Sequence, residues 1–512
     1  MGEIYETVGN EIRNAGREIT RLGNELWNLS FPRRSPAISR LSRELLSEIF
    51  LFTLCLHGFG PLDAQSRISA EPLTLCHVSA RWRDVAISTP SLWSTIWIDR
   101  PREVHLIMTE VWARYSQQCP LTIYLRQTPP APQGQPPPSF MDAHEYDITE
   151  TILMCLGNHL ERWKRVTFLF FHQTQETLLS LLEFAKSGAP LLEHIHMTTG
   201  GWDIKSKQLL ERMMYSYPSV KSIVVHKSLS QEFIRWGRLT RLDSHMGCPR
   251  DSYLAVLKAC SSLRIAELRV TQDHDNTPFK PPRHHICVPE LTSLTIHADR
   301  VDLVAIFECI VLPKLEGLVL RYSATPRADN DAQALERLLV RSACTLQRFS
   351  LRDITPIRDD SRHLGFLLLP HMSSILELFL QVDITDNILT HLTLPSPDHD
   401  TPARGLFPKL RMLSLRDLRG DHVDDLLLYR LVVSRFPGPT PDRNGRYSGP
   451  LHIVYFRLRV KGHSASPVLP LLVERCRDRI DLRIYLEQCT DLHVKVGWYT
   501  SPPIPGGYLT EG

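Results

Sequence analysis

One apolar pattern recurs from about residue 160 onward and limits the folds that this chain can adopt. An apolar residue is followed by a second three positions later and a third two positions after that, often with a proline just before the first. The clearest copies are Leu192, Ile195, Met197; Val220, Ile223, Val225; Leu291, Leu294, Ile296; Leu315, Leu318, Leu320; and Leu410, Leu413, Leu415, and weaker copies begin at Trp163, Leu263, Leu346, Ile375 and Leu451. The alternation at the end of each copy predicts a short strand with one buried face.

Helix-like stretches separate the copies, and neighbouring copies mostly lie 24 to 31 residues apart. A strand and a helix repeated at this period are the signature of leucine-rich repeats. One such unit cannot bury its own apolar strand face, so stacked units share a continuous core. We therefore predict an α/β fold in which residues 159–500 form a leucine-rich-repeat solenoid of short parallel strands with helices.

The repeats lack one side chain that usually accompanies this pattern. Leucine-rich repeats place Asn or Cys eight positions after the first leucine. The residues found there are Gly200, Ser228, Thr271, Asp299, Ser323, Ile354, Asp383 and Leu418. None is Asn or Cys, so we expect an irregular array.

The same repeated pattern predicts a row of basic residues on the outer face of the strands, because strand residues that alternate with the buried leucines face away from the core. Six positions after each first apolar residue stand Leu169, Thr198, His226, Arg269, His297, Arg321, Arg352, Gln381, Arg416 and Arg457. Arginine forks bind carboxylate and phosphate well, so we assign the five arginines to an acidic or phosphorylated protein client. The alternative is that they only solvate the strands, with Asp353 and Asp417 cancelling part of their charge.

The chain on either side of the repeats divides into shorter segments. The predicted divisions are 1–34, an amphipathic helix and linker; 35–100, a helical domain; 101–158, a connecting segment with a proline-rich mobile loop over 128–141; and, after the repeats, a tail over 501–512. The first helix either packs loosely on the rest of the chain or pairs as a short coiled coil, and its three glycines favour the first.

Residues 73–98, LTLCHVSARWRDVAISTPSLWSTIWI, allow three interpretations: a core helix, a basic nucleic-acid patch around Trp82, or part of a module that holds a partner. On one helix, Leu75, Val78 and Trp82 share a face, whereas Arg81 points away. Acidic residues nearby oppose nucleic-acid binding. We therefore expect Trp82 to be a core residue and expect no nucleic-acid partner.

Residues 35–98 together resemble an F-box-like domain. The matching residues are Leu41, Glu44, Leu45, Leu46, Ile49 and Phe50 in a first helix, Leu75, Val78, Arg81, Trp82, Arg83 and Ala86 in a second, and then Pro90, Leu92 and Trp93. The sequence is similar over residues 1 to about 170 to the F-box-like proteins abundant in mushroom-forming fungi. Those proteins continue with STPxLWSxI, CPLxIxL and RW+xLxL motifs, here Ser88 to Ile96, Cys119 to Leu125 and Arg162 to Phe168.

The resemblance implies a substrate receptor that docks the Skp-type adaptor of a cullin–RING ubiquitin ligase. It assigns adaptor binding to Leu41, Ser42, Leu45, Ile49, Phe50, Leu75 and Val78, and structural roles to Trp82, Pro90 and Trp93. The first helix also carries more large apolar residues than one small domain can bury, which favours a protein partner on that helix.

Two departures from the family pattern stand in these helices. The family's first helix usually opens with Leu-Pro, whereas here Ser42 follows Leu41, and its second usually reads V-C-R-R-W, whereas residues 78–82 read V-S-A-R-W. Ser42 can cap the helix in place of proline. The alternative function is a non-ligase interaction scaffold that keeps the fold without binding the adaptor.

Composition and motifs narrow the remaining classes. The net charge of +3 gives no general attraction to polyanions, and no stretch approaches the roughly 18–20 apolar residues that span a bilayer. We expect no signal peptide and no membrane partner. Eleven cysteines without a C-x-x-C pair favour a reducing compartment, the cytoplasm or nucleus.

No sequence motif for metal, phosphate or nucleophilic catalysis is present. RHHIC (283–287) could hold a metal, but no second half at suitable spacing accompanies it, so we interpret it as a solvated loop. SPDHD (396–400) is similarly a polar connector between prolines. We expect no catalytic residue, no metal and no cofactor. An enzyme that uses a pocket of the array is the competing function, and no motif supports it.

Overall fold

The structure is a computed structural model of residues 1–512. It describes residues 37–56, 71–128, 141–170, 174–184, 189–199, 203–215, 217–225, 236–244, 247–271, 285–323, 330–353, 361–394, 406–419, 425–435, 453–461, 481–489 and 494–500. The predicted helix within residues 1–34, nearly all of the loop 128–141 and the tail 501–512 lie outside the described residues. No helix in the described part is long and apolar enough to cross a membrane.

Two compact units make up the described chain, one within residues 1–220 and the other within residues 221–510. Both combine parallel strands with helices, so the predicted α/β class is confirmed. The finer division into five segments stays a prediction.

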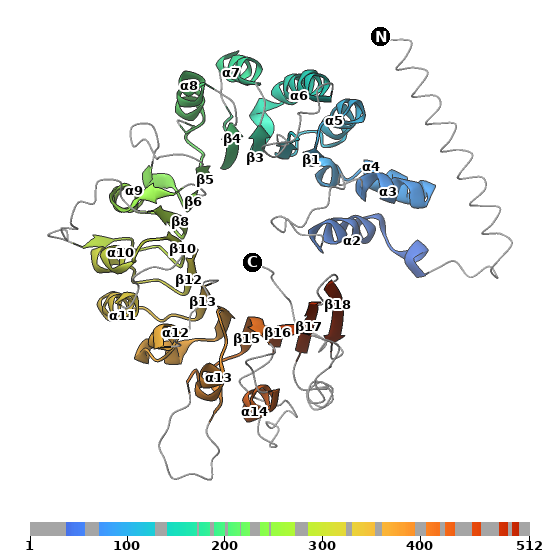
Figure 1. Ribbon diagram of the computed structural model, residues 1–512. Coiled ribbons are helices and arrows are strands. Elements are labelled where there is room, and N and C mark those ends of the chain that lie inside the picture. Colours follow the sequence, from blue (N-terminus) through green and yellow to red (C-terminus); the bar gives the residue numbers. More distant parts are fainter. Residues whose placement is uncertain are drawn as a thin grey trace, which may run out of the picture. The chain divides into compact units, whose positions relative to one another are not determined.

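The first unit begins with helices and continues with alternating strands and helices (Figure 1). Its elements are η1 (Ala37–Arg40), α2 (Arg43–Leu56), α3 (Glu71–Val78), α4 (Ala80–Ile87), η2 (Pro90–Trp93), β1 (Thr95–Asp99), α5 (Glu103–Tyr115), β2 (Leu121–Arg126), α6 (Met141–Gly157), η3 (Leu160–Arg162), β3 (Trp163–Phe170), α7 (Gln175–Phe184), β4 (His194–Thr199) and α8 (Ile204–Tyr215). Strands β1 to β4 pair in chain order and run parallel, and a helix between successive strands makes the crossover that parallel strands need. The alternation therefore starts at β1, before residue 159.

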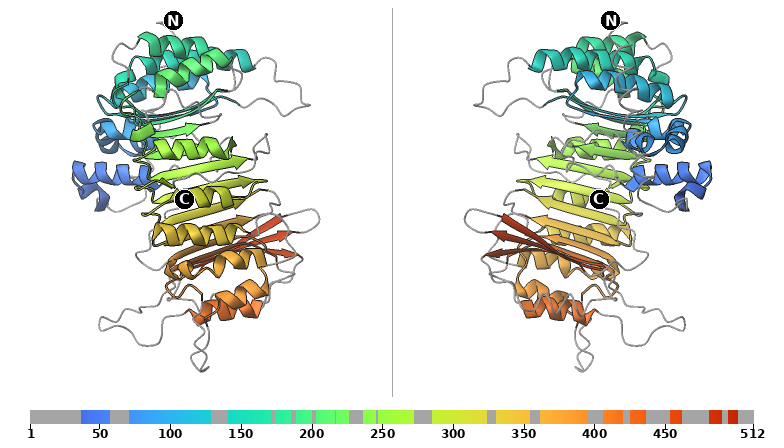
Figure 2. Two further views of the ribbon diagram at one scale, coloured as in Figure 1. Left: turned by 90° about the vertical axis from the view of Figure 1, so that its left-hand side faces the viewer. Right: turned by 90° about the vertical axis from the view of Figure 1, so that its right-hand side faces the viewer.

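The second unit alternates strands and helices in the same way. Its elements are β5 (Ser222–Val225), η4 (Trp236–Arg238), β6 (Arg241–Ser244), β7 (Cys248–Pro249), α9 (Arg250–Ala259), β8 (Ile265–Thr271), β9 (Ile286–Cys287), β10 (Ser293–Asp299), α10 (Val304–Cys309), β11 (Ile310–Val311), β12 (Gly317–Tyr322), α11 (Asp331–Ser342), β13 (Arg348–Asp353), α12 (Ser361–Leu367), η5 (Pro370–Ser374), β14 (Glu377–Gln381), α13 (Asp386–Leu392), β15 (Met412–Arg419), α14 (Asp425–Ser434), β16 (Ile453–Lys461), β17 (Asp481–Cys489) and β18 (Val494–Thr500). The sheet order is β5-β6-β8-β10-β12-β13-β14-β15-β16-β17-β18, with helices over one face of the strands (Figures 1 and 2). This arrangement is the one expected of a repeat solenoid.

The last pair of strands departs from the prediction. β17 and β18 pair antiparallel, with Arg483 opposite Thr500 and Cys489 opposite Val494. An antiparallel pair can be joined by a tight connection, whereas a parallel pair needs a crossover of a dozen or more residues. Only residues 490–493 separate these strands, so the prediction of parallel strands up to residue 500 is wrong here.

The apolar triplets build the core of the second unit. Leu294, Leu318, Phe349, Leu378 and Leu413 are successive register partners across β10 to β15, and each is fully buried. Burying one such side chain contributes about 1.5–3 kcal/mol. A slip of one residue would turn a whole strand's apolar set outward, so the triplets also determine the register.

Arginines near the ends of two helices bind backbone carbonyls in an array that lacks the usual asparagine. Arg435 follows α14 and donates hydrogen bonds of 2.5–3.0 Å to the carbonyl oxygens of Leu392, Leu406 and Phe407. Arg341, in the last turn of α11, reaches back in the same way to two carbonyls at the end of α10. Each guanidinium group therefore joins neighbouring repeats of the second unit.

Candidate functional site

Helix α2 begins with a side-chain cap and buries one stripe of apolar residues. The Ser42 hydroxyl accepts a hydrogen bond of 3.3 Å from the Leu45 backbone N–H, which is the cap predicted in place of proline. Leu46 and Phe50, four residues apart and so on one side of the helix, are 0% and 1% exposed. These two side chains attach α2 to the rest of the first unit.

A second apolar stripe of α2 is exposed. Leu45, Ile49 and Phe52 stand at positions i, i+4 and i+7, which lie on one side of a helix, and they are 54%, 40% and 56% exposed. The outer face of an amphipathic surface helix is normally polar. These three residues, the α2 stripe, are therefore the first candidate binding surface.

The single helix expected over residues 73–87 is two helices. Helix α3 ends at Val78, and Ser79 begins α4 by accepting a hydrogen bond of 3.1 Å from the Trp82 backbone N–H. The extended backbone of Ser79, with φ of −162°, interrupts the helical period. Val78 is consequently 56% exposed, and the prediction that it shares a buried face with Trp82 is wrong.

Two contacts set α4 against α2. The Arg81 guanidinium was expected to point away, but it donates a hydrogen bond to the Leu41 backbone carbonyl just before α2. The Trp82 ring is half-buried and packs on Phe50, with ring centroids 4.8 Å apart at an angle of 51°. Arg81 and Trp82 therefore hold the start and the middle of the helix that carries the α2 stripe.

Trp93 anchors the turn that follows α4. Pro90 begins η2, and three residues later the Trp93 indole is 1% exposed and donates a hydrogen bond of 2.8 Å from Nε1 to the Ala86 carbonyl. Its ring meets that of Trp112 edge-on, with centroids 5.0 Å apart. Trp163 makes the same kind of bond, at 3.0 Å, to the carbonyl seven residues before it. Both tryptophans are packing residues.

The residues assigned to adaptor binding occupy different environments. Ser42, Leu45, Ile49 and Val78 are exposed, Leu41 and Leu75 are half-buried, and Phe50 is buried. Phe50 needs correction, because a ring packed on Trp82 within the chain cannot also be the contact surface for a partner. Phe52 was left out of the predicted set, although its spacing from Leu45 and Ile49 is the signal that places it on the α2 stripe.

A second candidate surface lies on the face of the second unit's sheet that the helices leave open. Across β8, β10 and β12 to β15, the register aligns Arg269, His297, Arg321, Arg352, Gln381 and Arg416. We call these six residues the cross-strand row. Arg269, Arg352 and Arg416 are exposed, and the other three are half-buried. Arg457 lies on β16, and its side chain is outside the described residues.

The charge of the cross-strand row is uneven. Glu267 Oε1 lies 2.7 Å from His297 Nε2 and 3.6 Å from Arg321 Nη1, so one end of the row has an internal carboxylate that sequence analysis missed. Asp353 does not cancel the row's charge as expected. It is 2% exposed on the helix-covered face, where its Oδ2 lies 3.4 Å from His363 Nε2. Arg352 makes no ion pair within the described part of the chain.

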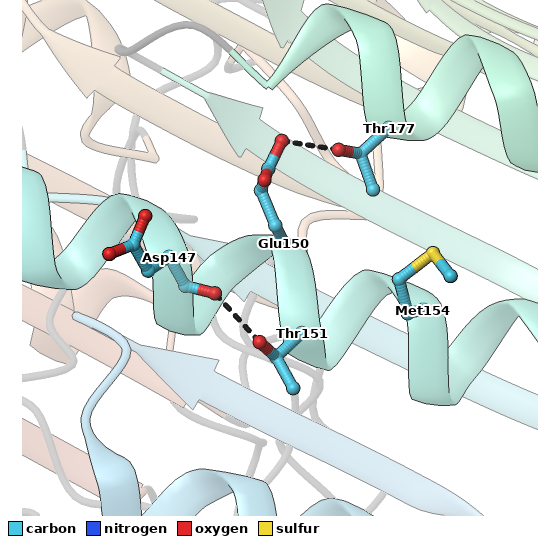
Figure 3. Close-up of a pocket in the computed structure, with 5 residues that line it drawn as sticks. All are labelled: Asp147, Glu150, Thr151, Met154 and Thr177. Atoms are coloured by element: carbon cyan, nitrogen blue, oxygen red, sulfur yellow. Dashed lines mark hydrogen bonds between the residues drawn. The ribbon is translucent and has the colours of Figure 1, made fainter.

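A depression between α6 and α7 is lined by Asp147, Glu150, Thr151, Met154 and Thr177 (Figure 3). Glu150 accepts hydrogen bonds from the Thr177 and Tyr146 hydroxyls, and Thr151 donates to the Asp147 carbonyl. The bond to Glu150 raises the pKa of Tyr146 to about 12. The Glu150 carboxylate and the hydroxyls of Thr151 and Thr177 are therefore already engaged in hydrogen bonds within the chain.

The candidate metal ligands do not come together in the described residues. Within those stretches, no group of three His, Cys, Asp or Glu residues could hold a metal ion. His285 and Cys287 of the RHHIC segment are exposed on and beside β9, whereas His284 and the whole SPDHD segment lie outside the described residues.

Comparison with known proteins gives little. No family model matches the sequence, and no curated protein matches it. A crystal structure of the Rad7 and Elc1 complex in yeast is similar over 94% of this chain and 96% of the matched chain, with 13% sequence identity and a TM-score of 0.41.

Proposed function

We propose that this protein is the substrate-receptor subunit of a Skp–cullin–F-box type ubiquitin ligase. In this proposal η1 and helices α2 to α4 form an F-box-like module that docks a Skp-type adaptor, and the open face of the second unit binds a protein client. The observation that carries the proposal is the α2 stripe, which lies on the helix that resembles the first F-box helix.

The size of the α2 stripe suits a protein partner. With roughly 200 Å² for each large side chain, its exposed fractions amount to roughly 300 Å² of apolar surface. At about 25 cal/mol per Å², covering this surface would contribute about 7 kcal/mol before the costs of association. Anchors at i, i+4 and i+7 are also the pattern by which one helix docks in an apolar groove of its partner.

The remaining features fit a receptor. Such a subunit needs no active site of its own, because the ubiquitin chemistry takes place on other subunits of the ligase. It requires a surface for a client, which we assign to the cross-strand row. We place its action in the cytoplasm or nucleus.

A pull-down of the full-length protein with a purified Skp-type adaptor tests the proposal. The unmodified protein should be retained, and Leu45→Asp or Ile49→Asp should abolish retention, because docking would bury an unpaired carboxylate. Val340→Asp is the matched control, since Val340 is 60% exposed on α11, and it should bind like the unmodified protein. Phe50→Asp is unsuitable, because it would disrupt packing inside the first unit.

The competing function, a scaffold that keeps the fold without joining a ligase, predicts a different result. The adaptor would not be retained at all, or its retention would be the same with Ile49→Asp. Either result would replace the ligase proposal, provided that circular dichroism shows the variants to be folded.

A further inference from the structure

Two aromatic rings stack on the face of β1 to β4 that helices α5 to α7 leave open (Figure 1). Trp97 on β1 and Tyr124 on β2 are register partners, and both are half-buried. Their rings are nearly parallel, at 4°, with centroids 3.7 Å apart. Because the partners stand on neighbouring strands, the axis of this stack runs across the sheet from β1 towards β3. One face of the Tyr124 ring therefore contacts Trp97, and the other is turned towards β3.

The next residue in this row is too small to cover the Tyr124 ring. The register continues from Tyr124 to Thr167 on β3 and then to His196 on β4. Neighbouring strands lie about 4.8 Å apart, so the backbones at Tyr124 and His196 are roughly 10 Å apart, with only the short Thr167 side chain between them. Aromatic rings pair with centroids roughly 4.5–7 Å apart, so a flat side chain seated over Thr167 would stack on Tyr124.

A positive charge stands beside Thr167 on the same strand. Arg165 precedes Thr167 by two residues, so the two side chains share the open face of β3. The Arg165 side chain is exposed, and its guanidinium group makes no ion pair or hydrogen bond within the described part of the chain. Asp99, the one carboxylate within β1 to β4, lies 3.7 Å from Arg126 Nε instead. This face therefore presents an aromatic ring next to an unpaired cation.

The spacing of these groups matches an extended peptide. A strand rises about 3.3 Å per residue and its side chains alternate, so Arg165 and Thr167 are about 6.6 Å apart along β3. In an extended peptide that lies along β3, residues i and i+2 face the sheet with the same separation. With an aromatic residue over Thr167, a carboxylate two positions away would lie beside Arg165, and the guanidinium fork can bind it.

A single-stranded nucleic acid also stacks its bases on aromatic rings, but it needs a positively charged groove along its backbone. Arg165 is the one lysine or arginine in the two rows concerned. Its own row contains Thr95, Thr122 and His194, and the row of Tyr124 contains Trp97, Thr167 and His196. The charge therefore favours a peptide with one carboxylate over a phosphate backbone.

We propose that the open face of β1 to β4 binds an extended peptide segment in which one residue separates an aromatic side chain from a carboxylate. The aromatic ring stacks on Tyr124 above Thr167, and the carboxylate pairs with Arg165. The inference rests on the proposed function, because it makes this segment part of a client of the receptor. It gives the first unit a recognition site of its own, in addition to the client surface assigned to the second unit.

An array of immobilised peptides, probed with the full-length protein, tests the motif. Two positions separated by one serine are varied through all residues, in both orders, within an otherwise glycine–serine sequence. We expect the strongest retention where Trp, Tyr or Phe is combined with Asp or Glu, and weaker retention where the same two residues are adjacent. An array with no preference for an aromatic residue, or with none for a carboxylate, overturns the proposal.

Fluorescence anisotropy with the best peptide of the array assigns the contacts. Arg165→Glu should weaken binding at least about tenfold, because an attracting charge is replaced by a repelling one. Arg114→Glu is the matched control at an exposed position of α5, and it should change the affinity less than about twofold. An equal loss with Arg114→Glu would mean general attraction to positive charge and would overturn the site.

Substitutions at Tyr124 and Thr167 test the stacking position. Tyr124→Ala should weaken binding about fivefold, whereas Tyr124→Phe keeps the ring and should bind like the unmodified protein. Thr167→Trp puts a ring of the chain itself where the ligand ring would lie, so it should abolish binding, and Thr167→Ser should preserve it. Undiminished peptide binding by Thr167→Trp protein overturns the stacking assignment.

Two further measurements separate the outcomes. Single-stranded DNA that binds more tightly than the peptide, and depends on Tyr124 in the same way, would overturn the peptide assignment. The adaptor pull-down depends on the α2 stripe, so Arg165→Glu protein should still retain the adaptor. Peptide binding without adaptor binding refutes only the ligase function, and adaptor binding without the aromatic and acidic preference refutes only this inference.

Discussion

Replacing Arg435 with methionine tests whether buried arginines join the repeats of the second unit. The Arg435 side chain is 0% exposed, and its guanidinium group donates to the carbonyls of Leu392, Leu406 and Phe407. Burial lowers its pKa from 12.5 to about 10. Methionine keeps a long, flexible apolar stem but removes both the charge and the hydrogen bonds.

Two opposing terms decide the size of the effect. A lowered pKa of a basic group means that folding disfavours its charged form, and with about 1.4 kcal/mol for each pKa unit, removing the charge stabilises the fold by about 3 kcal/mol at neutral pH. Leaving three buried carbonyls without a donor costs about 1–3 kcal/mol each, or about 6 kcal/mol together. The carbonyl term is larger, so we expect a net loss of about 3 kcal/mol.

Hydrogen–deuterium exchange of α13 and α14 is the suitable assay, because a chain with two compact units does not unfold in a single two-state step. A loss of about 3 kcal/mol corresponds to roughly hundredfold faster exchange of the protected amides, given a factor of ten for every 1.4 kcal/mol. Arg435→Lys should exchange at least as fast, because lysine keeps the buried charge but cannot reach three carbonyls with one ammonium group. Arg430→Met, at an exposed position of α14, should leave the exchange unchanged.

Two results would refute this reasoning. Unchanged exchange in Arg435→Met protein would mean that the carbonyls find other donors when the arginine is absent. Amide exchange in Arg435→Lys protein that is as slow as in the unmodified protein would mean that the positive charge at this position stabilises the fold and that the forked guanidinium geometry does not matter.

Three further outcomes are expected. Trp93→Phe keeps most of the ring but leaves the Ala86 carbonyl without its donor, so the first unit should lose about 1–3 kcal/mol in a proteolysis assay, and unchanged resistance would contradict a role as anchor. Ser79→Ala removes the α4 cap and should cost about 1 kcal/mol, seen as faster amide exchange in that helix alone. Burial raises the pKa of the Cys260 thiol to about 12, so at pH 8.5 it should resist iodoacetamide while exposed Cys287 is alkylated, and mass spectrometry that finds both modified equally would contradict its burial.

Much of the fold could be predicted because its signals are local. The apolar triplets place alternate strand residues on one face, and that alternation is enough to predict the core and the alignment of arginines in the cross-strand row. The same rule puts Asp353, two residues after buried Leu351, on the helix-covered side of β13. The location of Asp353 on the helix-covered face could therefore have been predicted from the sequence, although we expected it to lie beside the arginines.

The errors lie where two local patterns compete. Apolar residues keep helical spacing across residues 73–87, but Ser79 can also cap a helix, and only the folded chain puts its hydroxyl on the Trp82 N–H. On α2, Ile49 and Phe50 are adjacent and both apolar. Which of them is buried depends on where the Trp82 ring lies, so one became a surface residue and the other a core residue.

The sequence by itself determined the α/β class, the parallel strands that contain an apolar triplet, the Ser42 cap and the line of arginines, because patterns local in the chain decide each of them. Only the tertiary structure decided which charged side chains have partners within the chain. The Glu267 carboxylate on β8 pairs with His297 on β10 and with Arg321 on β12, and Arg435 binds carbonyls one repeat away. The physical reason is that electrostatic and hydrogen-bond energies depend on distances in space, and residues 28 or more positions apart in the chain meet only after the repeats have stacked.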